Sequence, residues 1–338
     1  MKLLRKIIYY FTILCCTLLI LCTMLSLVYD IPRWYLKVLD FPRTQYLIAA
    51  VALLIIFILV NKKWKTPSFL LLSGLVASIF IQLNFILPYF AGEKTVPNAN
   101  MELVKPENTV SILLGNVLIT NHHAEEFLDI IRNANPDMVL AMEVDDWWVE
   151  NLQSLNSTYP HRMSLPLDNA YGMALYSKLP LENTKIRFFN HSRVPSFHAD
   201  VKLPSGKRFR FHGMHPVAPF PSDKYPENIG DGGKDEQKEV ALQKLGKIVA
   251  REEIPSLVAG DFNDVSWSHT SRLLEKEDIL DNVRIGRGLY NTFNAKSLMM
   301  RWPLDHFFVS EEFSVVKIQR LPKFHSDHFP ILAELALE

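Results

Sequence analysis

Six apolar segments of the chain, each with a composition typical of a buried strand, end in side chains that can bind a metal ion or move a proton. These side chains are Asn116, Glu143, His215, the pair Asp261 and Asn263, Asp305, and the pair Asp327 and His328. Strand ends that gather at one edge of a sheet sandwich would bring such side chains together in a cleft open to water. Because an unpartnered buried carboxylate costs on the order of several kcal/mol, a divalent cation is the partner that would most readily stabilise the predicted cluster.

The ligand types in these segments favour a hard cation. Carboxylate and amide oxygens dominate, and residues 93–338 contain no cysteine, so Mg²⁺ is expected, with Mn²⁺ as the alternative, in preference to zinc. Magnesium held by few carboxylates keeps open positions and commonly meets a phosphate there. The predicted chemistry is therefore phosphoester hydrolysis, in which the metal polarises a phosphoryl oxygen and a histidine paired with an aspartate activates water.

Each segment taken alone also has a purely structural explanation. The stretch AGDFND is typical of a strand that exits into a turn, because Gly, Asp and Asn are common turn residues. A single histidine such as His215 is typical of a surface position, and His212 is expected in the core or on a sheet surface. Asp305 with His306 could form a cap, and of this pair only Asp305 is a candidate site residue. The prediction of a site therefore rests on the whole set.

The segments between these side chains predict alternating strands and helices. Apolar runs predict strands at residues 109–118 and 136–144, and apolar residues at helical spacing predict helices at 123–134 and 145–155. Further strands are expected at 171–178, 185–190, 196–203, 207–215, 254–263, 304–310, 314–321 and 329–337, and helices at 234–252 and 268–278. Mixed strand pairs with interposed helices predict an α/β (α+β) four-layer sandwich, in which two mixed β-sheets are flanked by helices.

The charge distribution separates an N-terminal part from the rest. Of the 36 basic and 36 acidic residues, nine and two lie in residues 1–92, which leaves 27 and 34, a net charge of −7, for residues 93–338. Three stretches of the basic part, 7–29, 44–61 and 66–92, carry no charge, and each is close to the length of about 20 residues that crosses a bilayer. We expect a membrane anchor of three transmembrane helices at 1–92, a linker at 93–108 and a catalytic domain at 109–338.

The number of membrane-spanning helices and the placement of basic residues determine the expected location of the catalytic domain. A cleaved signal peptide is the alternative for the first stretch, but the apolar run is long for a signal and no small-residue cleavage site follows it. The second stretch is the shortest, and whether it spans fully is open. The positive-inside rule places the basic N-terminus and the NKKWK link in the cytoplasm. The expected location is the bacterial inner (cytoplasmic) membrane, with the catalytic domain extracytoplasmic.

Seven motifs occur in an order that resembles a known superfamily. They are GNVL, AMEVD, YGMALYSK, HGMHP, AGDFND, PLDHFFVS and SDHFPI. In this order they are similar to the endonuclease/exonuclease/phosphatase superfamily, which includes deoxyribonuclease I and exonuclease III, and the similarity covers residues 109–336. The RGLYNTF stretch and the apolar N-terminus resemble a bacterial membrane-anchored subgroup. The resemblance implies a two-sheet sandwich and metal-dependent hydrolysis of phosphoesters.

The resemblance also implies metal and phosphate ligands. Glu143 would be the principal metal carboxylate, with Asn116 and Asp327 helping to hold metal or phosphate. Asn263 would bind a phosphoryl oxygen, and His215 would contact the phosphate from the opposite side. The first motif departs from many relatives, in which an aromatic residue precedes the asparagine; here Gly115 does. This departure affects the pocket wall and leaves the metal ligands unchanged.

Proton-transfer roles follow from the same resemblance. His328 would be the general base that activates water, or the imidazolium that stabilises the phosphorane, and Asp305 would orient it. Asp261 would position the water or protonate the leaving group. Because the set includes every expected acid and histidine, the sequence predicts an active enzyme.

The substrate is predicted only as a class. The net charge of −7 on residues 93–338 disfavours non-specific grip on nucleic acid, which depends on many basic residues. A phosphodiester of either a lipid head group or a nucleic acid is expected, hydrolysed beside the membrane, and nothing in the sequence indicates a protein partner. The alternative function is a non-catalytic module that binds or scaffolds a phosphorylated ligand at the membrane.

Overall fold

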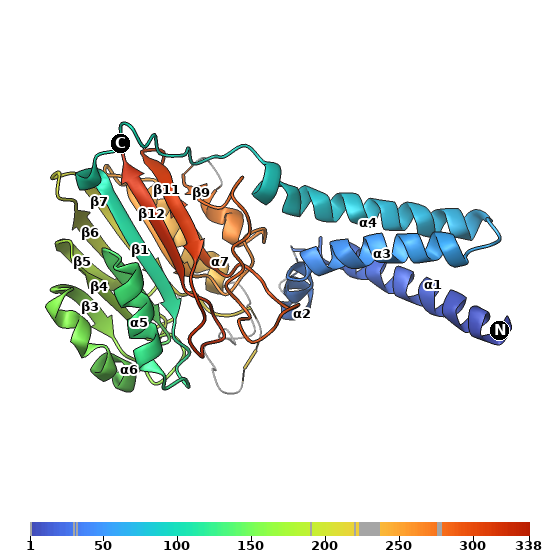
Figure 1. Cartoon of the computed structure of the whole chain (residues 1–338), viewed down its shortest axis with the longest axis horizontal. Coiled ribbons are helices and arrows are strands. Elements are labelled where there is room, and N and C mark those ends of the chain that lie inside the picture. The colour runs from blue at the N-terminus through green and yellow to red at the C-terminus, as the bar shows by residue number, and fades with distance from the viewer. Residues whose placement is uncertain are drawn as a thin grey trace. The chain divides into compact units, whose positions relative to one another are not determined.

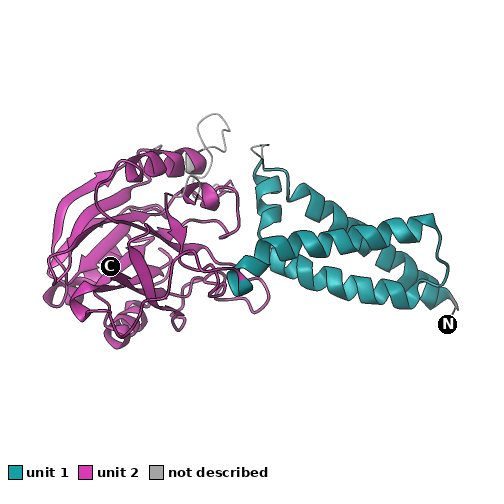
Figure 2. Ribbon diagram, turned by 90° about the horizontal axis from the view of Figure 1, so that it is seen from above, with its two compact units in different colours: residues 1–91 teal, residues 92–338 magenta. Residues whose placement is uncertain are grey.

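The computed structural model describes residues 2–29, 31, 33–189, 191–219, 221–222, 237–275 and 279–338. The chain forms two compact units, residues 1–91 and residues 92–338, which Figure 2 shows in separate colours. Each unit has a hydrophobic core of its own.

The first unit contains three long apolar helices. These are α1 (Lys2–Leu25), α3 (Arg43–Val60) and α4 (Thr66–Ala91); a short helix, α2 (Trp34–Lys37), and a 3-10 turn, η1 (Val38–Asp40), lie between the first two. By length and composition all three long helices could cross a membrane. Buried polar groups also join them: the Gln82 side chain accepts a hydrogen bond from Arg43 at 3.1 Å and donates one to Thr23 at 3.2 Å.

The second unit is built on two six-stranded sheets (Figure 1). The first sheet has the order β11-β12-β1-β2-β4-β3, and the second has the order β5-β6-β7-β8-β10-β9. The strands of the first sheet are β1 (Thr109–Asn116), β2 (Met138–Met142), β3 (His161–Leu165), β4 (Met173–Ser177), β11 (Phe313–Arg320) and β12 (Ile331–Leu337). Those of the second are β5 (Leu181–Arg187), β6 (Ser196–Lys202), β7 (Arg208–Met214), β8 (Ser256–Asp261), β9 (Asp281–Asn282) and β10 (Asp305–Val309).

Both sheets are mixed. In the first, β1 runs parallel to β2, and in the second, β7 runs parallel to β8; the other pairs are antiparallel. The inner faces of the two sheets form one core, in which Leu114 and Leu140 of the first sheet share a cluster with Phe211 and Phe307 of the second. Burial of this apolar surface is the main force that holds the sheets face to face.

Helices cover the outer faces. Buried residues of α5 (Ala124–Ala134) and α6 (Asp146–Asn151) share a core with Leu113 and Val139 of the first sheet. On the second sheet, α7 (Gln237–Val249) shares a core with Met214 and Val258. The short 3-10 turns are η2 (Pro106–Asn108), η3 (Gln153–Ser157) and η6 (Ser271–Leu274). The four-layer sandwich with two mixed sheets, and the three long apolar helices before it, are confirmed.

Local chemistry explains where elements begin and end. The helix predicted at 145–155 breaks into α6 and η3, and the Asp145 carboxylate caps α6 by accepting a hydrogen bond from Trp148 N at 2.9 Å. The prediction of a helix at 268–278 is wrong for the described residues of this range, because the only helical element among them is the 3-10 turn η6. There the Ser268 hydroxyl accepts a hydrogen bond from Ser271 N at 3.0 Å, at the start of this short turn. The predicted positions 234–236 and 276–278 lie outside the described residues.

One glycine fixes the close approach of β8 to the chain that leaves β7. Gly260 has φ = +149°, and a Cβ at this position would lie 1.8 Å from the Met214 carbonyl oxygen. Only glycine tolerates this conformation and this contact together. The following residue, Asp261, is therefore held next to His215, which follows Met214.

Candidate active site

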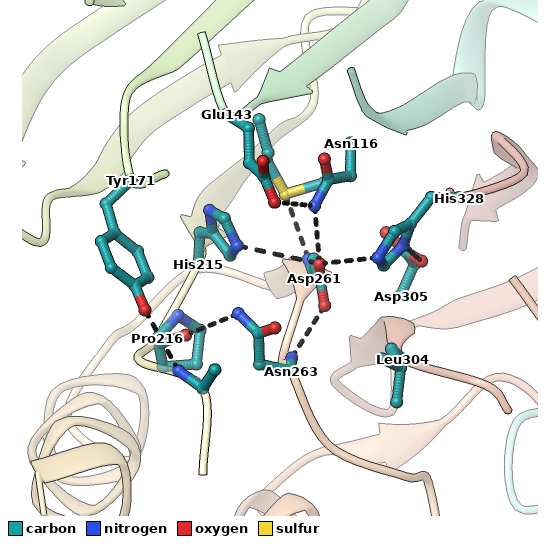
Figure 3. Close-up of polar contacts among 12 residues, drawn as sticks. Asn116, Glu143, Tyr171, His215, Pro216, Asp261, Asn263, Leu304, Asp305 and His328 are labelled. Carbon is teal, nitrogen blue, oxygen red and sulfur yellow. Dashed lines mark hydrogen bonds and ion pairs between the residues drawn. The ribbon is translucent and has the colours of Figure 1, made fainter. Parts of the chain in front are cut away.

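The ends of strands from both sheets meet at one point (Figure 3). Asn116 ends β1, and Glu143 directly follows β2, its parallel neighbour. In the second sheet Asp261 ends β8, and the antiparallel register places Asp305, the first residue of β10, directly opposite it. A backbone-to-side-chain hydrogen bond joins the two sheets here: Asp261 N donates to Met142 Sδ at 3.1 Å.

Asp261 lies at the centre of the polar contacts and is completely buried. Its Oδ2 atom accepts a hydrogen bond from Asn116 at 3.0 Å and lies 3.7 Å from His215 Nε2 and 3.5 Å from His328 Nε2 (Figure 3). Its Oδ1 atom accepts from Asn263 N at 2.7 Å. Burial raises the pKa of Asp261 to about 6, although the positive charge of His328 acts against this rise.

His328 lies between two carboxylates. Its Nδ1 atom donates a hydrogen bond to Asp305 Oδ2 at 2.9 Å, while Nε2 faces Asp261. Burial alone would lower the pKa of His328, but the charges of Asp305 and Asp261 outweigh it and raise the pKa to about 10. Burial would raise the pKa of Asp305, yet the charge and the hydrogen bond of His328 leave it below its ordinary value. The three groups form a buried carboxylate–imidazolium–carboxylate arrangement.

Glu143 and Asp327 form the acidic side of the cluster. Glu143 Oε1 accepts a hydrogen bond from Asn116 at 2.9 Å, and Oε2 accepts one from Ile119 N at 3.3 Å. Burial raises the pKa of Glu143 to about 7; the hydrogen bond from Asn116 lowers it, and the negative charge of Asp327 adds to the rise. The Oδ1 atom of Asp327 is buried and has no hydrogen-bond partner among the described residues. Two adjacent carboxylates with an orphaned oxygen fit a hard divalent cation.

His215 approaches Asp261 from the other side. The ring is buried, and neither nitrogen has a hydrogen-bond partner within the described part of the chain. Burial lowers the pKa of His215 to about 3, and the charge of His328 adds to this. Next to it, the Asn263 side chain donates a hydrogen bond to Pro216 O at 3.1 Å, and Asn263 takes a positive φ of 51°. His215 therefore offers a neutral imidazole with an unused N–H.

All eight residues singled out in the sequence occur in this one cluster; the role of each remains a prediction. His306, set aside in favour of Asp305, has Nε2 2.9 Å from Asp264 O and Nδ1 3.0 Å from Arg284. His212, expected in the core or on a sheet surface, is fully buried and lies 3.0 Å from Glu252.

Two residues of the cluster, Thr292 and Tyr171, are not predicted from the sequence. The Thr292 hydroxyl accepts hydrogen bonds from Leu304 N at 3.2 Å and Asp305 N at 3.3 Å, and its hydroxyl also bonds the Asp305 carboxyl. The ring of Tyr171 lies 5.2 Å from that of His215, and its hydroxyl accepts from Ala218 N at 3.2 Å. Both residues stand in motifs that carried the resemblance, RGLYNTF and YGMALYSK, which was the available signal.

Comparison with known proteins supports this architecture. A family model described as "Endonuclease/Exonuclease/phosphatase family" matches residues 98–328. No curated protein matches the chain by sequence.

Three solved structures illustrate the likeness of the fold. TDP2 from D. rerio complexed with a single-strand DNA product has a TM-score of 0.54 at 15% identity, over 67% of this chain and 98% of that one. An endonuclease/exonuclease/phosphatase family protein from Bacteroides thetaiotaomicron has a TM-score of 0.54 at 15% identity, over 68% and 98%. The human Nocturnin catalytic domain with bound sulfate has a TM-score of 0.53 at 17% identity, over 70% and 96%. At these identities the likeness establishes the fold and nothing further.

Proposed function

The chain belongs to the endonuclease/exonuclease/phosphatase family, and from that premise we propose that it is a membrane-anchored, divalent-metal-dependent phosphodiesterase. One observation carries the proposal: the side chains of Asn116, His215 and His328, which lie far apart in the sequence, all contact the carboxylate of Asp261. A buried acid shared by two histidines and an amide serves no packing purpose that an apolar residue would not serve better. It suits the transfer of a proton at a phosphoryl group.

The metal in this proposal is Mg²⁺, or alternatively Mn²⁺. Glu143 and Asp327 would hold it, and Asn116 would connect it to Asp261, because the Asn116 amide donates to both Glu143 and Asp261. When bound, the cation would polarise a phosphoryl oxygen and stabilise the negative charge of the leaving group. The orphaned oxygen of Asp327 and the raised pKa of Glu143 support this assignment.

The chain's own side chains would carry the proton transfers. Asp261 would take a proton from the attacking water as the water oxygen forms a bond to phosphorus and the ester bond breaks; the departing oxygen then takes a proton from solvent. His328 has two proposed roles, the base for water or the charged ring that stabilises the phosphorane. We favour the second, because each of its ring nitrogens already faces a carboxylate. Asp305 would hold the ring in place.

Two side chains would position the phosphate. His215 has no hydrogen-bond partner among the described residues, so one N–H can donate to a phosphoryl oxygen. Asn263 is held beside it through its bonds to Asp261 and Pro216. Together they would fix the scissile group opposite Asp261, so that attack and departure are in line.

The three long apolar helices support membrane attachment. We propose that the basic N-terminus and the link at residues 61–65 lie in the cytoplasm of a bacterium, which leaves the catalytic unit outside the inner membrane after three crossings. A reporter enzyme that is active only outside the cytoplasm, fused to the C-terminus, tests this. Activity of a reporter that works only in the cytoplasm would reverse the orientation.

The activity is tested on the full chain purified in detergent, with a soluble aryl phosphodiester and Mg²⁺ or Mn²⁺. Hydrolysis is expected, with loss on addition of EDTA and in Asp261→Asn. A panel of DNA, RNA, phospholipids and sugar phosphates then identifies the substrate class. If no phosphodiester is cleaved with either metal, while a phosphorylated ligand still binds without metal and to Asp261→Asn equally well, the chain is a binding or scaffolding module instead.

A further inference from the structure

A short loop beside the candidate site exposes three consecutive large apolar side chains. Leu298, Met299 and Met300 are 88%, 80% and 47% exposed. Leu298 and Met299 are the most exposed large apolar residues of the described chain, more so than any on the three apolar helices. We name residues 294–301 the apolar loop. Contiguous exposed apolar side chains are uncommon on the surfaces of soluble proteins. They mark sites that bind another protein, a membrane or an apolar ligand.

The loop has a defined conformation. Ser297 N donates to Asn294 O at 3.1 Å, and Lys296 N donates to the Asn294 side chain at 2.8 Å. Met300 N donates to the Ser297 hydroxyl at 2.9 Å, and Asn294 N donates to Met300 O at 3.3 Å. Internal hydrogen bonds therefore hold the turn, so the outward position of the apolar side chains is a property of the fold.

The base of the apolar loop is joined to the candidate site. Phe293 N donates to Trp302 O at 3.0 Å, which closes the loop, and the Phe293 ring lies 5.0 Å from the His328 ring. Ala295 N donates to Asp327 O at 2.7 Å. The same backbone that presents the apolar side chains thus supports the two residues, Asp327 and His328, proposed to act on the phosphate.

Charge beside the loop suits a phospholipid surface. Lys296 is exposed, and the Arg301 guanidinium lies over the Phe329 ring at 5.0 Å. Apolar side chains flanked by cations are the pattern of segments that lie in the head-group region of a bilayer, where the cations meet lipid phosphates. Exposed aliphatic side chains such as Leu298 and Met299 would not contribute to the binding of a nucleic acid in solution.

The chain itself supplies the reason to choose a bilayer as the occupant. The second unit starts at Gly92, directly after α4, which is one of the three helices able to cross a membrane. The catalytic unit is thereby tied by a covalent link to a lipid surface. A protein partner or a second copy has no comparable support.

We propose that the apolar loop inserts into the head-group region of the membrane and that the substrate is therefore a phosphodiester of a membrane lipid. This substrate assignment rests on the proposed phosphodiesterase function, whereas insertion of the loop does not. Because the apolar loop starts beside the candidate site, its insertion would bring lipid head groups close to that site. Insertion is compatible with every step of the hydrolysis described above.

The test uses the full chain reconstituted into vesicles of phosphatidylglycerol and phosphatidylethanolamine. The loop variant is Leu298→Ser with Met299→Ser, and the matched control is Met101→Ser with Leu103→Ser, whose side chains are 67% and 75% exposed. The control residues precede Thr109, at the opposite end of β1 from Asn116. Two rates are measured, the hydrolysis of vesicle lipid and that of a soluble aryl phosphodiester.

We expect the loop variant to lose about tenfold or more of its lipid hydrolysis while its rate on the soluble diester stays within about twofold, and the control to keep both rates. Equal loss on both substrates, or equal lipid hydrolysis by the loop variant and the unaltered chain, overturns the proposal. The proposal is also overturned if the unaltered chain hydrolyses the soluble diester but releases no product from vesicle lipid.

A second measurement keeps insertion testable without activity. An environment-sensitive fluorophore is attached at Leu298→Cys, and at Leu103→Cys as control, in a chain whose Cys15, Cys16 and Cys22 are replaced by alanine. In vesicles that contain brominated lipid, quenching of the fluorophore is expected at position 298 and not at position 103. Quenching at 298 without any phosphodiester hydrolysis means that the proposed function fails while insertion stands. Absence of quenching, or crosslinking of position 298 between two copies, overturns insertion.

Discussion

Asp305 Oδ2 lies 2.9 Å from His328 Nδ1, and both side chains are buried at the meeting point of the two sheets. The bond fixes the ring orientation, so that Nε2 faces Asp261 at 3.5 Å. The Asp305 carboxylate thus determines how the His328 ring is placed relative to Asp261, next to the position proposed for the phosphoryl group.

Asp305→Asn keeps the size of the side chain and removes its charge. We expect kcat on a soluble phosphodiester to fall by about 100-fold or more, because a misoriented and less positive His328 no longer stabilises the transition state. KM should change little, since Asp305 is not proposed to touch the substrate. Steady-state kinetics give both constants.

His306→Gln is the control for this change, because the neighbouring His306 is equally buried but bonds Asp264 and Arg284 instead. It should lower the thermal unfolding midpoint and leave kcat nearly unchanged. If Asp305→Asn behaves in the same way, with a stability loss and an intact kcat, the pair with His328 is structural.

Glu143→Gln tests the metal. The substitution keeps an oxygen able to accept from Ile119 N but removes the carboxylate charge, so the metal concentration needed for half-maximal activity should rise by about 10-fold to 100-fold or more. Titration calorimetry with Mg²⁺ and Mn²⁺ measures the same loss without substrate. The exposed Glu311→Gln serves as the control and should bind metal as the unaltered chain does. Unchanged metal binding in Glu143→Gln would remove Glu143 from the metal site.

How much of this arrangement the sequence predicts depends on the kind of contact. The strand ends bearing Asn116, Glu143 and Asp261 are predictable, because each follows a largely buried apolar run and such ends share an edge of a sheet. The pairing of Asp305 with Asp261 was not, since it depends on which strands neighbour each other. The register that β8 and β10 adopt is a property of the packed core.

Short or polar elements escaped prediction for a related reason. The strand β3, HRMSL, has one buried residue and no clear alternation, and β9 has only two residues, so their pairing partners define them. Thr292 was not predicted because its hydroxyl acts through backbone contacts with Leu304 and Asp305, which are distant in sequence. The sequence therefore predicts residue types at strand ends, while the side chains that support them emerge from tertiary structure.

Gly260→Ala tests the backbone contact that places Asp261. The added Cβ would lie 1.8 Å from Met214 O, so β7 and β8 must separate at the site. We expect a loss of about 3 kcal/mol or more in the free energy of unfolding, together with loss of activity. Gly206→Ala is the control: it also has a positive φ, +90°, but nothing lies within 4 Å of its Cβ, so about 1 kcal/mol is expected. Equal effects on the unfolding midpoint would mean that the clash is relieved at no cost.

His198 gives a prediction about pH. On the outer face of the second sheet, its Nδ1 lies 2.7 Å from His212 Nδ1 and its Nε2 lies 2.9 Å from the Ser196 hydroxyl. Burial lowers the pKa of His198 to about 2, and the charges of His212 and of basic residues on β5 and β7 add to this. The folded chain therefore keeps His198 neutral, whereas the unfolded chain protonates it near its ordinary pKa of about 6.5.

This difference in protonation determines how the stability of the folded chain changes with pH. The unfolded state binds the extra proton, so the stability that neutral His198 provides is complete above about pH 6.5 and is lost as the pH falls, by roughly 1.4 kcal/mol for each pH unit. The stability advantage of the unaltered chain over His198→Gln should shrink between about pH 7 and about pH 5, as measured by denaturant unfolding at each pH. A constant advantage across this range would show that the folded chain protonates His198 as readily as the unfolded chain does.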